Sequence, residues 1–140
     1  MDTLLPPGAP SLLESVARGA GLGLVAVFGS RARGDARPTS DLDLGVLHES
    51  GRALGREALG DLYVALSRWA EAPVDVVDLA TPDAIFRFEV AAQGRPLFQS
   101  EPGRWSDFVA RALIDHDDIA PFIEECIAGV GRAARAGTRR

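Results

Sequence analysis

Residues 24–46 read LVAVFGSRARGDARPTSDLDLGV, and this stretch decides the expected fold. An unbroken apolar run ends at Gly29 and Ser30, and after ten more residues the alternation DLDLGV begins at Asp41. This pattern is typical of a strand, a tight turn with a loop, and a second strand. Because successive strand residues point to opposite faces, we expect Asp41 and Asp43 on one face and the leucine between them on the other. Two such carboxylates, beside a turn that can approach phosphates closely, suit a pair of divalent metal ions.

An Asp-x-Asp pair alone is a weak signal, because the chain contains a second one at Asp115 and Asp117. That second pair interrupts a helix-like pattern and has no Gly-Ser turn before it. We therefore interpret it as a solvated or partner-facing acidic patch and assign the chemistry to the first pair.

The rest of the chain predicts helices alternating with strands around one small sheet. One domain over residues 1–140 is expected, since this length is too short for a separate substrate-binding domain. The fold class is α/β (α+β), with a small mixed sheet of three or four strands flanked by helices and a helical C-terminal segment. Beyond the two strands described above, the expected elements are a helix opening at a capping box over Ser11 and Glu14, a helix over about 52–70, a strand at 73–79, a helix from Thr81-Pro82 to Gly94, an edge strand at 96–98, and helix over about 104–131.

Residues 29–43 resemble the signature of the DNA polymerase beta-like nucleotidyltransferase superfamily, and RARG at 31–34 is similar to its minimal, single-domain members. The chain length and the order of the later segments resemble the MntA-type adenylyltransferase antitoxins, the partners of HEPN ribonuclease toxins. The specific resemblance covers a catalytic core of roughly residues 20–80. Beyond residue 80 it depends on element order and on the stretch at 88–97.

The resemblance implies a third carboxylate on a neighbouring strand, and Asp75 is the residue that matches it. Alternation places Asp75 and Val77 on one face of that strand and Asp78 on the other. Asp78 stands at the strand's end before a helix, and we interpret it as a loop or capping residue.

The resemblance also implies the chemistry, which is transfer of AMP from ATP to a hydroxyl. Asp41, Asp43 and Asp75 are the expected catalytic residues and the ligands of two Mg²⁺ ions, with Asp75 as a candidate proton acceptor. The expected nucleotide-binding residues are Gly29, Ser30, Arg31, Arg33 and Ser40. The sequence leaves open which of the two arginines faces the triphosphate, and the choice of ATP over another nucleoside triphosphate.

Composition excludes several other classes of protein. The net charge of −5 argues against direct nucleic-acid binding, and a chain whose basic residues are all Arg has no phosphate-binding loop of the Gly-Lys-Ser/Thr type. Cys126 is the only cysteine, so neither an intrachain disulfide nor a cysteine-based metal site is expected. The chain shows neither a bilayer-spanning apolar run nor a signal-peptide pattern, and a cytoplasmic location is expected.

Two classes of function follow from these observations. The first is an Mg²⁺-dependent adenylyltransferase that modifies a hydroxyl, expected on a Tyr, of a partner HEPN toxin and thereby acts as its antitoxin. The second is a non-catalytic antitoxin that neutralises its partner by occlusion; a nucleotidyltransferase acting on a small-molecule hydroxyl is a further alternative. The C-terminal helical segment could pack on the core or contact the partner, and a homo- or hetero-oligomer is compatible with either class.

Overall fold

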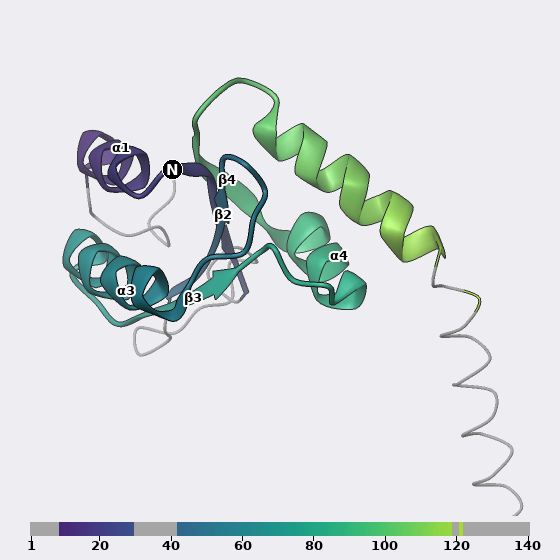
Figure 1. Cartoon of the computed structure of the whole chain (residues 1–140), viewed down its shortest axis with the longest axis horizontal. Helices are drawn as coiled ribbons and strands as arrows, with labels where there is room; N and C mark the ends of the chain where they lie inside the picture. Colours follow the sequence, from purple (N-terminus) through teal and green to yellow (C-terminus); the bar gives the residue numbers. More distant parts are fainter. Residues whose placement is uncertain (1–8, 30–41, 119–120, 122–140) are drawn as a thin grey trace, which may run out of the picture.

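The computed structural model describes residues 9–29, 42–118 and 121 of this chain (Figure 1). Its regular elements are α1 (Pro10–Gly19), β1 (Leu22–Phe28), β2 (Leu42–His48), α3 (Arg56–Ala70), β3 (Val74–Asp78), α4 (Ala84–Gln93), β4 (Arg95–Gln99) and a helix over residues 104–118, here called the C-terminal helix.

The four strands form one mixed sheet in the order β3-β2-β1-β4. The central strand β1 pairs antiparallel with both β2 and β4, whereas β2 and β3 are parallel. The predicted edge strand is confirmed: Pro96 lies in β4, at the edge of the sheet where a residue without an N–H is tolerated. The fold class is therefore confirmed, with four strands in the described residues.

Helices cover both faces of the sheet, and each face has its own apolar cluster. Figure 1 shows α1 and α3 on one side and α4 with the C-terminal helix on the other. Val25, Val27 and Leu44 belong to the cluster under α1 and α3, whereas Leu24 and Phe28 belong to the cluster under α4. This alternation follows the period of two that strand geometry imposes, and it assigns each polar strand residue to one defined face.

The helix starts differ from the sequence expectations. Helix α1 begins at Pro10, and no side chain caps its N-terminus, so the predicted capping box is wrong. Proline is well suited to the first helical position, and Glu14 instead forms an ion pair with Arg18 one turn later, at 2.9 Å.

Helix α3 begins at Arg56, four residues after the predicted start at about residue 52. The segment before the helix is bound to Asp78 of β3 instead. The Leu54 N–H donates a 2.7 Å hydrogen bond to Asp78 Oδ2. Helix α4 begins at Ala84, and its cap is Asp83, whose Oδ1 accepts from the Phe86 N–H at 3.1 Å. The end at Gly94 agrees with the prediction.

No helix in the parts of the chain that the structure describes has the length and apolarity needed to cross a membrane.

Candidate active site

Two of the three predicted carboxylates lie side by side on the parallel strands β2 and β3. Asp43 is the register partner of Asp75, so both side chains leave the sheet on the same face, and we call them the carboxylate pair. This is the face covered by α4, because the neighbouring Leu42 and Leu44 belong to the cluster under α1 and α3. Asp43 is half-buried and Asp75 is exposed, so the pair is accessible from solvent at the beginning of both strands.

Gly29 brings the turn after β1 directly against Asp43. Its φ is +76°, in the region that disfavours residues with a Cβ, and the preceding Phe28 is the register partner of Asp43. A Cβ added at Gly29 would overlap the carboxylate of Asp43. Two independent features therefore require glycine at this position: the positive φ of the backbone and the close approach of the Asp43 side chain.

Asp78 has a different role from the carboxylate pair. Its Oδ2 accepts from Leu54, as described above, and its Oδ1 accepts a 2.9 Å hydrogen bond from the Ala80 N–H. It stands opposite Val46 in the register of β2 and β3, three residues beyond Asp75. Both oxygens thus hold loops in place, which agrees with the sequence interpretation of a loop residue.

The two residues of the second Asp-x-Asp pair, Asp115 and Asp117, have different environments. Asp115 Oδ2 accepts a 2.6 Å charge-assisted hydrogen bond from Arg87 of α4, whereas the side chain of Asp117 is 86% exposed. The ring of His116 stacks on Phe88 with 3.9 Å between centroids. This segment is therefore partly a contact between α4 and the C-terminal helix, and the interpretation as a merely solvated or partner-facing patch was incomplete.

The other predicted site residues, Ser30, Arg31, Arg33, Ser40 and Asp41, lie outside the described residues. Within the described part of the chain no group of three or more Asp, Glu, His or Cys side chains is close enough to hold a metal ion. The described contribution to the site is the carboxylate pair and the Gly29 turn. Two oxygen-rich side chains beside a glycine turn can bind hard cations and can accept a proton.

Comparison with known protein families identifies the fold. The family described as "Polymerase beta, Nucleotidyltransferase" matches residues 13–102, which include β1, β2, β3 and the carboxylate pair. The chain belongs to this nucleotidyltransferase family. Its catalytic type is thus that of a nucleotidyltransferase domain, as the signature at residues 29–43 predicted.

Solved structures with the same fold come from toxin–antitoxin complexes. A chain of a toxin–antitoxin crystal structure with AMP-PNP aligns at a TM-score of 0.73 and 23% identity, covering 86% of this chain and 97% of that one. A complex of a tri-AMPylated HEPN toxin of Shewanella oneidensis with its MNT antitoxin gives 0.67 and 21%, over 86% and 94% of the two chains. At these identities the likeness demonstrates the fold. Curated proteins give no match to this chain.

The sequence did not predict a second cluster of polar residues at the opposite end of β2 and β3. A cavity there is lined by residues from four separate segments, among them Arg87, Arg104 and Arg111. The only available signal was the spacing of Arg104 and Arg111, seven residues or about two helical turns apart. That spacing is so common that it carried no prediction.

Proposed function

We propose that this protein is an Mg²⁺-dependent adenylyltransferase that transfers AMP from ATP to a hydroxyl of a partner HEPN ribonuclease toxin, expected on a Tyr, and so acts as an antitoxin. We also propose that residues 1–140 form a single nucleotidyltransferase domain. The observation that carries the proposal is the parallel register of Asp43 with Asp75, with the Gly29 turn pressed against the Asp43 carboxylate. Membership of the nucleotidyltransferase family supports the reaction type.

The carboxylate pair would supply two of the ligands of a magnesium site. Mg²⁺ prefers hard oxygen ligands, and the carboxylate pair supplies them on one face of the sheet, with Asp75 accessible to solvent. We assign Asp41, Asp43 and Asp75 as the residues that would hold two Mg²⁺ ions. When bound, the ions would neutralise the charge that develops on the attacking oxygen, the transferred phosphoryl group and the leaving pyrophosphate.

The residues of the turn and loop would bind the triphosphate. Gly29 allows the backbone to come close to phosphate oxygens, and Ser30 supplies a hydroxyl and an amide donor. Arg31 or Arg33 would supply the positive charge, since guanidinium groups bind phosphate oxygens bidentately. Ser40 would add a hydroxyl on the other side of the loop. None of these assignments requires Lys, which the chain lacks.

The reaction follows from this arrangement. The acceptor hydroxyl oxygen attacks the α-phosphorus of ATP, a new P–O bond forms, and the bond to the pyrophosphate leaving group breaks. The proton of the hydroxyl passes to a carboxylate oxygen of Asp75, which is exposed and therefore accessible to an acceptor on another protein.

The proposed partner is supported by the fold. Structures that share it include a toxin–antitoxin complex with AMP-PNP and a HEPN toxin that carries AMP in complex with an MNT antitoxin.

The test is co-expression with a candidate HEPN-type protein from the same genome, followed by intact-mass and peptide mass spectrometry of that partner. We expect mass additions of AMP on a Tyr hydroxyl with the wild-type enzyme and none with Asp43→Asn. If the partner stays unmodified yet is neutralised equally by both forms, occlusion is the mechanism and the enzymatic proposal fails. AMP found only on small molecules would reject the protein acceptor.

A further inference from the structure

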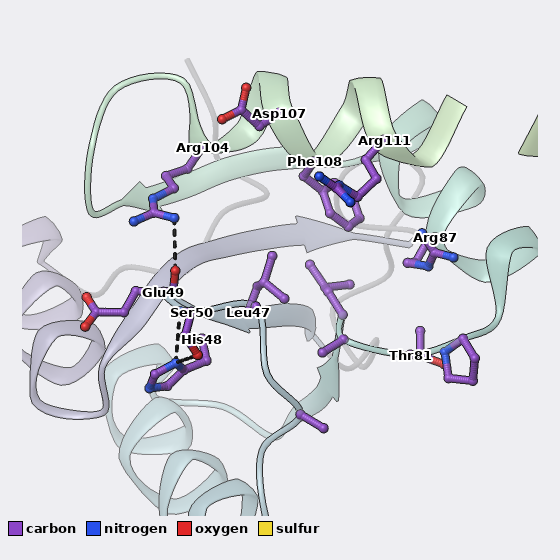
Figure 2. Close-up of a pocket in the computed structure, with 15 residues that line it drawn as sticks. Leu47, His48, Glu49, Ser50, Thr81, Arg87, Arg104, Asp107, Phe108 and Arg111 are labelled. Carbon is purple, nitrogen blue, oxygen red and sulfur yellow. Dashed lines mark hydrogen bonds between the residues drawn. The ribbon is translucent and has the colours of Figure 1, made fainter. Parts of the chain in front are cut away.

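A cavity of about 740 Å³ lies at the end of β2 and β3 opposite to the carboxylate pair (Figure 2). It is bordered by the segment 47–53 after β2, the segment 79–82 after β3, Arg87 of α4, and the C-terminal helix. We call it the arginine pocket, after Arg87, Arg104 and Arg111. Its volume falls within the range of about 300–1,000 Å³ typical of small-molecule sites.

The three arginines are held in different ways. Arg104 donates from Nη1 to the Glu49 carbonyl oxygen at 3.1 Å and from Nε to Ser100 Oγ at 3.2 Å, so its side chain is fixed across the pocket mouth. Arg87 is fixed by Asp115, its side chain is only 15% exposed, and its buried Nε has no hydrogen-bond partner among the described residues. Arg111 is exposed and forms neither a hydrogen bond nor an ion pair within the described ranges.

The acidic residues around the pocket neutralise this cluster only in part, and Glu101 Oε2 lies 4.0 Å from Arg104 Nη2. Figure 2 shows the carboxylates of Glu49 and Asp107 directed away from the pocket, while Arg111 lies beside Phe108 and Arg87 borders the pocket from α4. One acid, Asp115, is used by Arg87. Guanidinium groups with unused donors that border one cavity are suited to bind an oxyanion, and phosphate geometry matches their planar fork.

The interior of the pocket is apolar. Leu79 is 1% exposed and Phe108 is 8% exposed, and both belong to the cluster under α4, with Leu47 packed against them. Thr81 adds a hydroxyl at the rim. A ligand with a charged group and an apolar body would satisfy both parts of this surface, because the apolar body would be removed from water against the two leucines and the phenylalanine.

The arginine pocket is separate from the carboxylate pair. Leu47 stands four residues after Asp43 on β2, which corresponds to about 13 Å along a strand. Between them, Leu79 packs over Gly45, where an added Cβ would approach the leucine side chain to 2.8 Å. A nucleotide bound at the Gly29 turn would therefore leave the arginine pocket free.

We propose that the arginine pocket is a second ligand site that binds a small organic phosphate. Arg104 and Arg111 contact the phosphate group, and Arg87 on α4 adds positive charge to the pocket. The organic part of the ligand lies against Leu47, Leu79 and Phe108. The site is independent of the proposed nucleotidyl transfer and requires no metal ion.

The test uses the full-length protein with AMP as the probe, in the presence of EDTA, and an Asp43→Asn background that weakens the proposed metal site. Backbone amide shifts in NMR titrations should change at residues 47–51, 79–82 and 104–111, and calorimetry should give the affinity. Arg111→Gln and Arg104→Gln should each weaken AMP binding at least about tenfold, as expected for loss of a charge-assisted hydrogen bond. Arg56→Gln, an exposed arginine at the start of α3, is the matched control and should bind AMP like its parent.

Several results would overturn the proposal. If Arg111→Gln, Arg104→Gln and the control Arg56→Gln bound AMP with equal affinity, the arginines would have no role in binding. Adenosine binding as tightly as AMP would likewise show that the phosphate group is not recognised. Inorganic phosphate binding as tightly as AMP would reject an organic ligand. Shifts confined to residues 28–29, 43 and 75, or no AMP-dependent shifts at all, would reject the site itself. Because Arg111 is exposed, its substitution is expected to leave the fold intact, and unchanged amide dispersion verifies this.

Discussion

The two ends of the parallel pair β2 and β3 carry opposite chemistry. At their beginning, the half-buried Asp43 and the exposed Asp75 stand side by side next to a glycine turn. At their other end, three arginines from α4 and the C-terminal helix border a cavity that is also lined by leucine and phenylalanine side chains. Both regions lie on the face of the sheet covered by α4, so one face carries two carboxylates and, about 13 Å along the strand, three arginines.

This difference has a structural origin. The carboxylate pair is fixed by strand register alone, because neighbouring positions in a parallel ladder must share a face. The arginine pocket depends on where two helices pack, and it is held together by the bonds from Arg87 to Asp115 and from Arg104 to Glu49. We therefore expect substitutions at the first end to change chemistry with little effect on folding, whereas the second end is sensitive to helix packing.

The largest expected effect separates the two ends directly. Asp43→Asn should reduce nucleotide transfer on the order of 10³-fold or more, because it removes a ligand for charge that develops in the transition state. The metal-free melting temperature should change little, since the amide has nearly the same shape as the carboxylate and one of two adjacent negative charges is removed. Transfer rates from mass spectrometry and thermal unfolding measure both. Asp61→Asn on the exposed surface of α3 is the charge-matched control, and an equal loss in that variant would contradict the assignment.

Asp75 and Asp78 lie on the same strand, β3, and should differ in their effects on activity and stability. Asp75→Asn should lower transfer on the order of 10²-fold or more with little change in stability, because it is exposed and its predicted role is chemical. Asp78→Asn should have far less effect on transfer but should lower the free energy of unfolding by about 1–3 kcal/mol, because an amide NH₂ would replace an oxygen that accepts from a backbone N–H. Single-turnover assays and denaturant unfolding separate the two effects. The reverse ranking in activity would exchange the assigned roles.

The sequence predicted the first end of the strand pair well because its information is local. A strand, a Gly-Ser turn and an alternating strand lie within residues 24–46. The choice of Asp75 came from the family resemblance, and strand alternation predicted only the face on which it lies. The mixed sheet and the edge strand over Pro96 were confirmed for the same reason. These features depend on patterns of period two and on turn residues.

The remaining features required contacts between distant segments. The late start of α3 follows from a hydrogen bond between Leu54 and Asp78, 24 residues apart, which no helical period reveals. The predicted capping box at Ser11 was wrong because the helix already begins at Pro10, whose fixed φ suits the first helical position. Ser11 therefore lies inside the helix and cannot be its N-cap. The arginine pocket unites segments from residue 47 to residue 111, so its existence could not be read from the spacing of any one element.

Substitution of Gly29 tests whether its close approach to the Asp43 carboxylate matters for nucleotide transfer, or whether only the backbone conformation of the turn matters. Gly29→Ala should reduce nucleotide transfer by about 10- to 100-fold, because the added Cβ displaces the Asp43 carboxylate from its position. Gly51→Ala is the matched control: its φ is +78°, similar to the +76° of Gly29, but nothing lies within 4 Å of its added Cβ. Both variants should lose about 1 kcal/mol of stability from backbone strain. Equal activity losses in the two would show that the contact with Asp43 has no catalytic consequence.

Ligand linkage gives a further test of the separation between the two ends. Mg²⁺ with a non-hydrolysable ATP analogue at about 100 times its Kd should stabilise the wild-type protein by about 2.7 kcal/mol, or roughly 5–10 °C in melting temperature. Asp43→Asn should lose most of this shift because the carboxylate pair is broken, whereas Arg111→Gln, at the other end of β2 and β3, should retain it. Differential scanning fluorimetry with and without EDTA measures each shift. If Arg111→Gln lost the shift as completely as Asp43→Asn, the nucleotide would span both ends, and the separation imposed by Leu79 over Gly45 would not hold in the bound protein.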